Sequence, residues 1–226
     1  MTQTSPAFRI EIRRNCGDSQ WGYPELDQRQ RQIATEIQEG APGALLLSEV
    51  APVITLGRRT PQTDLLFDIK KFKEQGITVY ETDRGGLGTY HGPGQWVVFP
   101  VDRLEVLTGD PRGVRKIVHA LLDLGLAVAR TYDSDAEIRD GAQIGVWNKK
   151  GKLASVGIHV QDGILFHGLC INGYRTQESF WGLRPCGLDV QPSFLIDDAL
   201  QGIPRESAFL DLQERILDQA LQRFWI

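Results

Sequence analysis

The sequence of 226 residues has no long apolar run: none of its hydrophobic stretches approaches the about 18 residues that suggest a membrane-spanning helix. Its first 20 residues also lack the apolar segment of a signal peptide, because the arginines there alternate with strand-forming and acidic residues. Both absences argue against a membrane protein and against export. We therefore expect a cytoplasmic protein with no membrane partner.

Cysteine and histidine are too scarce and too scattered to suggest a metal site. The three cysteines, Cys16, Cys170 and Cys186, show no C-x-x-C spacing, and the four histidines form neither H-x-E nor H-E-x-x-H. Three thiols cannot all pair, and a cytoplasmic chain keeps its thiols reduced. We expect no disulfide and no metal ion.

A surplus of positive charge is missing as well. The chain carries 25 lysines and arginines against 29 aspartates and glutamates, which gives a net charge of −4 at pH 7. A general nucleic-acid binder would show the opposite balance, so we expect no nucleic-acid partner. Glycine, by contrast, is abundant, and 17 of its 24 residues cluster between positions 84 and 187. Such clustering is typical of tight turns and of a backbone that closely approaches a site.

Hydrophobic periodicity predicts a mixed α+β fold. Helical spacing covers residues 24–38, 64–74, 112–129, 177–183 and 206–223, with Asp64 as the expected N-cap of the second helix. Strand patterns cover residues 8–14, 44–49, 52–56, 78–82, 95–101, 143–148, 152–161 and 164–172. The last three strands are joined by short KKG and QDG turns. We expect one domain over residues 1–226, in which helices flank a mixed, largely antiparallel sheet.

Residues 84–95, RGGLGTYHGPGQ, contain five glycines and are expected to form a loop. Phosphate binding is an obvious interpretation, but no G-K-[ST] is present and the next segment has the pattern of a strand, so no helix N-terminus would face a phosphate. Two interpretations remain: a tight connection between strands, or a loop that presents side chains to a ligand. The varied chemistry of Arg84, Tyr90, His91 and Gln95 favours the second.

Cys186 lies between Pro185 and Gly187, in a turn context that exposes a side chain. A thiol with the ordinary pKa of about 8.5 needs a nearby cation, base or helix N-terminus to act as a nucleophile at pH 7. Lys152 begins a strand after a turn, where a lysine is commonly a solvated edge residue. Sequence context alone leaves open whether Cys186 is a nucleophile or an incidental surface thiol, and it does not bring Lys152 to it.

Three stretches, in order along the chain, resemble one enzyme family. DRGGLGTYHGPGQWVVFP is similar to R-G-G-x-x-T-[YF]-H-x-P-G-Q of the lipoate-pathway octanoyltransferases, which are octanoyl-acyl-carrier-protein:protein N-octanoyltransferases. KLASVGIHVQDGILFHGLCIN resembles that family's K-[IL]-A-[AS]-[LI]-G-[IV]-[RH]-V…[TS]-x-H-G-[LF]-A-L-N, and LRPCGL resembles I-N-P-C-G. With PVITLGR upstream, the resemblance covers roughly residues 49–188.

The resemblance implies the catalytic fold of the biotin and lipoate protein ligases and an acyltransferase activity of the EC 2.3.1 type. The family's active-site cysteine and lysine correspond to Cys186 and Lys152. His167 matches a family position that could orient the site. The expected substrate-binding residues are Arg84, Gly85, Gly86, Leu87, Gly88, Thr89, Tyr90, His91, Ser155, Val156, Gly157, Gly168, Leu169 and Cys170.

By the same resemblance, an octanoyl group would pass from acyl carrier protein to Cys186 and then to a lysine of a lipoyl domain. The expected acceptors are the 2-oxoacid dehydrogenases and the glycine cleavage H protein. Thioester exchange is nearly isoenergetic and amide formation is downhill, so we expect no ATP, no metal and no other cofactor. We expect a monomer that meets these acidic partners through local cations. The candidate cations are Arg58, Arg59, Arg112, Arg115, Lys116, Lys149 and Lys150.

Some positions depart from the family pattern, and two other functions are open. Arg184 replaces an asparagine before the cysteine, Cys170 replaces an alanine, and residues 173–179 are largely this chain's own. An ATP-dependent lipoate or biotin ligase would need no cysteine at 186, and its loop usually carries aspartate where this chain has Gly92. A non-catalytic binding module on the same fold is disfavoured by the presence of both Cys186 and Lys152.

Overall fold

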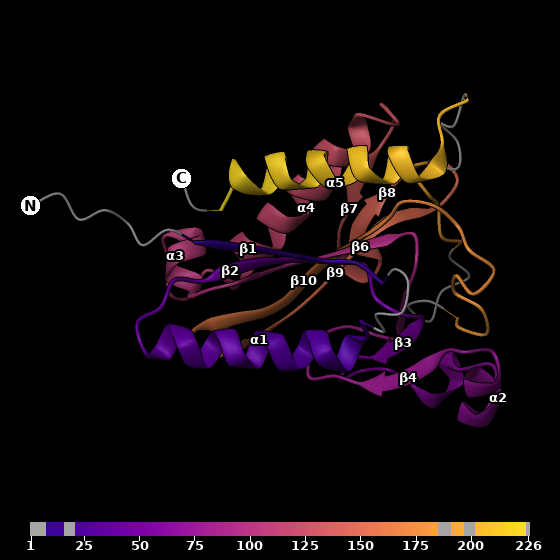
Figure 1. The fold of residues 1–226 in the computed structure, drawn as a ribbon, viewed down its shortest axis with the longest axis horizontal. Coiled ribbons are helices and arrows are strands. Elements are labelled where there is room, and N and C mark those ends of the chain that lie inside the picture. The colour runs from indigo at the N-terminus through magenta and orange to yellow at the C-terminus, as the bar shows by residue number, and fades with distance from the viewer. Residues whose placement is uncertain (1–7, 16–20, 185–190, 197–201, 225–226) are drawn as a thin grey trace, which may run out of the picture.

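The computed structural model describes residues 8–15, 21–184, 191–196 and 202–224. A seven-stranded sheet, in the order β1-β2-β6-β10-β9-β8-β7, forms its middle layer (Figure 1). The strands are β1 (Arg9–Arg13), β2 (Ala44–Ser48), β6 (Gln95–Val101), β7 (Glu137–Arg139), β8 (Gly145–Trp147), β9 (Lys152–Gln161) and β10 (Ile164–Asn172). All neighbours in this sheet are antiparallel except the parallel pair β1 and β2.

A smaller sheet and five helices complete the described fold. The smaller sheet has the order β4-β3-β5, with β3 (Val53–Leu56), β4 (Thr78–Glu81) and β5 (Thr89–His91). The helices are α1 (Tyr23–Gln38), α2 (Ile69–Glu74), α3 (Leu104–Thr108), α4 (Val114–Arg130) and α5 (Arg205–Leu221), with the 3₁₀ turns η1 (Gln62–Asp64) and η2 (Gly141–Gln143). This architecture confirms the predicted α+β fold with a mixed, largely antiparallel sheet.

The two faces of the large sheet bury separate hydrophobic clusters, because side chains alternate along its strands. Figure 1 shows α4 and α5 above the sheet and α1 below it. In β10, Leu165 and Leu169 belong to the cluster that also contains residues of α4 and α5, whereas Phe166 and Cys170 belong to the cluster of α1. The alternation along β10 therefore sends these four side chains into the two layers in turn.

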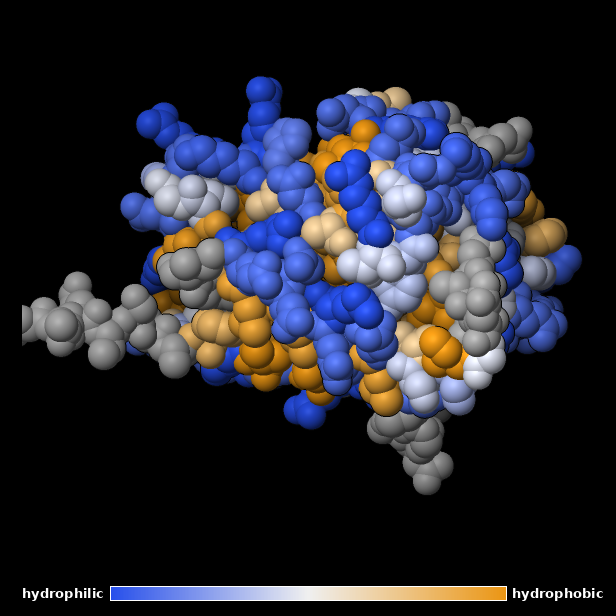
Figure 2. Space-filling model, turned by 90° about the horizontal axis from the view of Figure 1, so that it is seen from above, coloured by the Kyte–Doolittle hydropathy of each residue, from blue (hydrophilic) through white to orange (hydrophobic). Residues whose placement is uncertain are grey.

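The outer surface over α5 mixes polar and apolar side chains, as Figure 2 shows from above. Exposed apolar residues on α5 and on the edge strand β1 include Leu210, Leu221, Ile10 and Ile12. None of the described helices combines the length and the apolar character that a membrane crossing requires.

The prediction of a helix over residues 64–74 was wrong at its start, because the helix begins at Ile69. The side chain of Asp68, not of Asp64, caps this helix by accepting a hydrogen bond from the backbone N–H of Lys71 (2.9 Å). Residues before it are held outside the helix, because Leu65 pairs with Leu183 and the N–H of Leu66 donates to the carbonyl of Gly182. Tertiary pairing thus overrides the local helical pattern.

The other differences have equally local causes. The predicted helix at 177–183 consists of turns, because Phe180 (φ 59°) and Gly182 (φ 68°) adopt left-handed conformations that a helix excludes. The expected loop 84–95 contains strand β5, which pairs with β3 through its backbone. Strand β8 is shorter than the predicted 143–148, and α3 and β7 were not predicted.

Candidate active site

A cavity of about 410 Å³ lies between the glycine-rich loop and the strands β9 and β10. Its volume falls in the range of about 300–1,000 Å³ that is usual for small-molecule sites. The residues around it include twelve of the sequence-predicted set: Arg84, Gly86, Leu87, Thr89, His91, Lys152, Ser155, Val156, Gly157, Gly168, Leu169 and Cys170. The fold thus gathers the loop, the lysine and two strand segments around one space.

The remaining predicted residues lie elsewhere. Gly85, Gly88, Tyr90 and His167 are near the cavity in sequence but do not line it. Cys186 lies outside the described residues, as do Pro185 and Gly187 beside it. The site prediction for Cys186 therefore stays a prediction.

Sequence reasoning missed five residues as parts of the cavity wall: Arg59, Phe99, Gly141, Ala142 and Ile144. Arg59 was considered a docking cation, and its backbone N–H donates to the carbonyl of Gly86 (3.2 Å), which brings it to the glycine loop. The other four carry no polar side chain that could have marked them. Three of them belong to the segment that leads through η2 into β8.

The glycine loop is braced on both sides. The buried guanidinium of Arg84 donates from Nη2 to the carbonyl (2.8 Å) and the hydroxyl (2.9 Å) of Thr55 on β3. On the other side, the N–H of Gly85 donates to the carbonyl of Ile158 on β9 (2.9 Å). A Cβ at Gly157 would lie 3.3 Å from Cδ of Arg84, so glycine there lets the loop lie close against β9.

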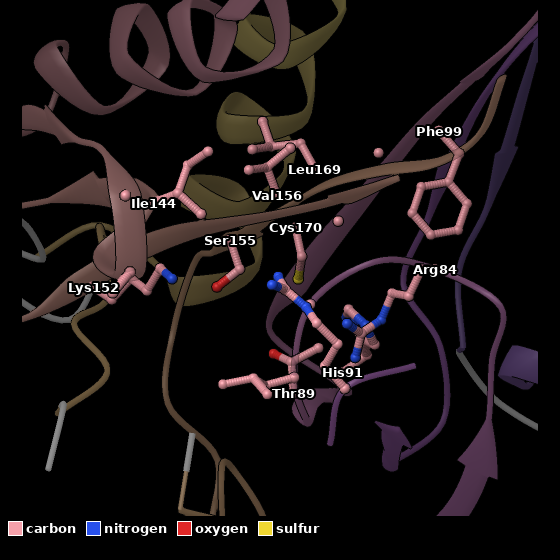
Figure 3. A pocket seen from close by; sticks show the side chains of 17 residues that line it. Arg84, Thr89, His91, Phe99, Ile144, Lys152, Ser155, Val156, Leu169 and Cys170 are labelled. Atoms are coloured by element: carbon pink, nitrogen blue, oxygen red, sulfur yellow. The ribbon is translucent and has the colours of Figure 1, made fainter. Parts of the chain in front are cut away.

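Ser155 and Cys170 face the cavity from neighbouring strands. They are partners in the β9–β10 ladder, and Figure 3 shows both side chains pointing to the side where Thr89 and His91 lie. Val156 and Leu169, the next pair in the ladder, point the other way. Both of these residues nevertheless line the cavity.

Lys152 begins β9 and points into the cavity toward Ser155 (Figure 3). Its ammonium group lies 5.4 Å from the ring centre of Trp147 on β8, a cation–π distance. Gly145 makes room for this side chain, because a Cβ there would lie 2.3 Å from Cε of Lys152. The backbone of Lys152 is fixed as well: its N–H donates to the carbonyl of Gln191 (3.0 Å).

These contacts fix both ends of the segment that contains Cys186. On one side, the N–H of Arg184 donates to the carbonyl of Asp64 (2.8 Å). On the other side, Gln191 meets the backbone of Lys152, and the N–H of Ser193 donates to the carbonyl of Lys152 (2.9 Å). The described chain therefore resumes, after residues 185–190, directly beside the lysine of the cavity.

Two buried titratable groups in the cavity wall are uncharged at neutral pH. Burial, assisted by Arg84 and His167, lowers the pKa of His91 to about 3, so its imidazole is neutral. Burial raises the pKa of the Cys170 thiol to about 12, so this cysteine stays protonated. A protonated, buried thiol is a poor nucleophile, which separates Cys170 from the role predicted for Cys186.

A second layer of polar side chains lies behind His91. The ring of Tyr23 stacks on that of His91 with centroids 5.4 Å apart and an interplanar angle of 17°. The hydroxyl of Tyr23 lies 3.1 Å from Nδ1 of His167, and Nε2 of His167 lies 2.9 Å from Asp83. Sequence reasoning found His167 but missed Tyr23 and Asp83, which carry no motif signal of their own.

Of the candidate docking cations, Arg59 borders the cavity, and all of them are exposed. Two already have acidic partners within the chain, since Lys116 pairs with Asp110 (3.3 Å) and Lys149 with Asp135 (2.5 Å). Within the described ranges, no group of three or more histidine, cysteine, aspartate or glutamate side chains could hold a metal ion.

Comparison with known proteins gives matches over most of the chain. The family model of the lipoyl protein ligase A/B catalytic domain matches residues 26–189. An octanoyltransferase of Magnetococcus marinus is 38% identical over 168 residues, which are 74% of this chain and 74% of the relative. An octanoyltransferase of Maridesulfovibrio salexigens is 35% identical over 186 residues, covering 81% and 85% respectively.

Solved structures share the fold at low sequence identity. Lipoate-protein ligase A bound with ATP superposes with a TM-score of 0.67 at 9% identity, covering 96% of this chain and 84% of that one. A bi-partite lipoate protein ligase from Thermoplasma acidophilum gives a TM-score of 0.61 at 9% identity, with 96% and 82% covered. At such identities the likeness concerns the fold alone.

Proposed function

The chain belongs to the lipoyl protein ligase A/B catalytic domain family and is an acyltransferase, and from this premise we propose that it transfers an octanoyl group from acyl carrier protein to a lysine of a lipoyl domain. One observation carries the proposal: Lys152, Ser155 and the braced glycine loop surround one cavity in a chain whose relatives are octanoyltransferases. A volume of about 410 Å³ lies in the range of small-molecule sites and has room for a medium-length acyl chain.

In the first step, the thiolate of Cys186 attacks the carbonyl carbon of the octanoyl thioester. A new C–S bond forms to Sγ of Cys186 and the C–S bond to the carrier breaks. The carrier leaves as a thiol after taking up a proton. One thioester replaces another, so the exchange is close to isoenergetic and needs no ATP.

Lys152 assists this step through its position beside the segment that contains Cys186. As an ammonium group it stabilises the thiolate by charge, and as an amine it accepts the proton of the thiol. A lysine and a cysteine that share a proton titrate as a pair, so their apparent pKa values belong to both groups. The contact between Lys152 and Gln191, the first described residue after 185–190, supports this pairing.

In the second step, the amine of the acceptor lysine attacks the acyl-cysteine. A C–N bond forms, the C–S bond to Cys186 breaks, and the proton lost by the amine returns to the cysteine sulfur through Lys152. Both steps pass through an oxyanion, which needs hydrogen-bond donors. Val156 and the loop from Arg84 to His91 supply the candidate backbone donors, whereas Leu169 is paired with strands on both of its sides.

A transfer assay tests this function. Purified protein is mixed with octanoyl-acyl carrier protein and a lipoyl domain without ATP, and octanoylation of the lipoyl domain is followed by mass spectrometry. We expect transfer by the wild type, no transfer by Cys186→Ser, and a severe loss with Lys152→Ala. Cys16→Ser is the matched control and should transfer normally.

The competing function is an ATP-dependent lipoate or biotin ligase. The same assay distinguishes the transferase from the ligase when the thioester donor is replaced by ATP with free octanoic acid, lipoic acid or biotin. Acylation that requires ATP and a free acid, and that survives Cys186→Ser, would replace the transferase proposal by the ligase.

A further inference from the structure

His167 has an unusual backbone conformation for a residue inside a strand. Its φ is +62°, in the left-handed region that residues with a Cβ atom rarely adopt, although its side chain is 1% exposed. The neighbouring residues Leu165 and Leu169 point into the core under α4 and α5, so regular alternation would send His167 there too. The left-handed conformation turns its imidazole to the opposite side, toward α1.

On that side the backbone N–H and both ring nitrogens of His167 find partners. Its backbone N–H donates to Oε1 of Gln30 on α1 (2.7 Å). Its Nε2 lies 2.9 Å from Oδ1 of Asp83, and its Nδ1 lies 3.1 Å from the hydroxyl of Tyr23. A carboxylate can accept but not donate, so Nε2 carries the proton and Nδ1 accepts from Tyr23. A buried strand residue keeps such a strained backbone conformation where several contacts with its surroundings hold it in place.

The chain of hydrogen bonds ends against the cavity. The ring of Tyr23 stacks on that of His91 at 5.4 Å, and the ring of His167 is nearly parallel to it at 6.4 Å and 14°. His91 lines the cavity, and its Nδ1 has no hydrogen-bond partner among the described residues. The placement of the His91 ring thus depends on the ring of Tyr23, which in turn depends on His167.

We propose that Asp83, His167 and Tyr23 are positioning residues for acyl transfer, and that their hydrogen-bonded chain holds the imidazole of His91 in the wall of the cavity. The inference depends on the proposed function. A neutral His91 offers a hydrogen-bonding nitrogen to the uncharged acyl thioester without placing a further cation beside Arg84 and Lys152. Fixed stacking keeps that nitrogen in one orientation during both steps.

Burial favours the neutral form of His167 that this chain of hydrogen bonds requires. Burial lowers its pKa most, Arg84 acts in the same direction, and Asp83 and Asp27 oppose them. Titratable and charged groups from several elements surround these hydrogen bonds. They are Tyr23 and Asp27 on α1, Asp83 with its partners Arg31 and His159, Arg84 at the start of the glycine loop, and His91 on β5. Replacing Asp83 by asparagine removes a negative charge and lowers the pKa of His167 further.

The first test compares two tyrosines in the transfer assay. Tyr23→Phe keeps the stacked ring but removes the hydroxyl that donates to His167. Because a neutral hydrogen bond of this kind changes a rate by about 3- to 10-fold, we expect kcat to fall by that factor with an unchanged KM for the donor. Tyr132→Phe is the matched control, since its hydroxyl bonds Asp211 (2.9 Å) outside the cavity wall.

The second test uses chemical rescue. Glycine adopts the backbone conformation of position 167 without strain, so His167→Gly is expected to fold and to lose at least tenfold in kcat. Free imidazole should restore part of the activity of this variant and leave the wild type unchanged. A purely structural role for His167 would not respond to imidazole.

The third test is the pH profile. Protonation of Nδ1 of His167 breaks its bond from Tyr23, so kcat of the wild type should fall in acid. Asp83→Asn lowers the pKa of His167, so the acid limb of its profile should move to lower pH. A variant that is merely destabilised would lose activity at all pH values without moving this limb.

The results separate the inference from the function on which it depends. If the wild type transfers octanoyl groups while Tyr23→Phe and folded His167→Gly match its kcat, the positioning role is refuted and the transferase stands. If the wild type transfers nothing, the transferase proposal fails, and the geometry is then tested by NMR of the imidazole nitrogens. A proton on Nε2 of wild-type His167 that is lost or moved in Tyr23→Phe supports the hydrogen bonds from Asp83 through His167 to Tyr23. A proton on Nδ1 of wild-type His167 at pH 7 overturns them.

Discussion

Replacing Gly145 by alanine should displace the amine of Lys152 and slow acyl transfer. A Cβ at position 145 would lie 2.3 Å from Cε of Lys152, 3.2 Å from its Nζ and 2.6 Å from the carbonyl oxygen of Ala154. The lysine side chain can swing away, but the carbonyl belongs to the neighbouring strand and resists movement. We therefore expect both a shifted Lys152 and a strained contact between β8 and β9.

The expected size follows from these two effects. A displacement of about 1 Å at a reacting group can cost about 100-fold in rate, so kcat should fall by about that factor. Overpacking costs about 1–3 kcal/mol of unfolding free energy, and each kcal/mol lowers Tm by about 2–4 °C in a chain of this size. A fall in Tm of several degrees should therefore accompany the loss of rate.

Gly145 also has a positive φ (+152°), so Gly40→Ala is the matched control for backbone strain alone. Gly40 has a φ of +97°, and a Cβ there meets nothing within 4 Å. This variant should lose some stability but transfer at the wild-type rate. Transfer kinetics and thermal unfolding are measured on both variants. Wild-type kcat in a folded Gly145→Ala protein would refute the argument that Gly145 determines where Lys152 lies.

Three further predictions concern the cavity wall. Arg84→Lys keeps the charge but loses the paired hydrogen bonds to Thr55. The unfolding free energy measured in urea should fall by about 1–3 kcal/mol, and transfer should slow. Equal stability of variant and wild type would contradict the bracing role of Arg84. The pKa of His91 is lowered to about 3, while an unfolded histidine binds a proton below about pH 6.5. Between these values the unfolded state binds more protons, so the unfolding free energy of the wild type should fall as the pH drops. His91→Gln should show a smaller fall. Identical slopes of unfolding free energy against pH in the two proteins would exclude a buried neutral His91. The buried thiol of Cys170, with a pKa of about 12, should resist iodoacetamide at pH 7.5 in the folded protein and react in urea. Peptide mass spectrometry measures the labelling. Rapid labelling of the native thiol would contradict its burial.

Local patterns predicted the strands around the site well. The bounds of β6, β9 and β10 agree with the sequence prediction, because alternating side chains and short turns define an antiparallel strand locally. The helix start at 69 could not be read locally, since Leu65 and Leu66 are held by residues 182–183, far away in sequence. Long-range pairing of this kind leaves no trace in a window of neighbouring residues.

The cavity was predicted to the extent that ordered motifs mark it. The motifs brought the glycine loop, Lys152 and the β9–β10 segments together, and the fold places them around one space. Motifs did not find Ile144 or Phe99, whose side chains are indistinguishable from ordinary core residues. Nor could they find the left-handed conformation of His167, which depends on partners from α1 and on Asp83, two residues after β4.

The central claim is that the acyl group passes through a cysteine of this chain. Intact-protein mass spectrometry after mixing with octanoyl-acyl carrier protein alone, with no acceptor, tests it most directly. The account predicts one added octanoyl group, mapped by peptide analysis to Cys186 and absent in Cys186→Ser. An unmodified wild-type protein that nevertheless acylates a lipoyl domain, or an octanoyl group found on another residue, would contradict it.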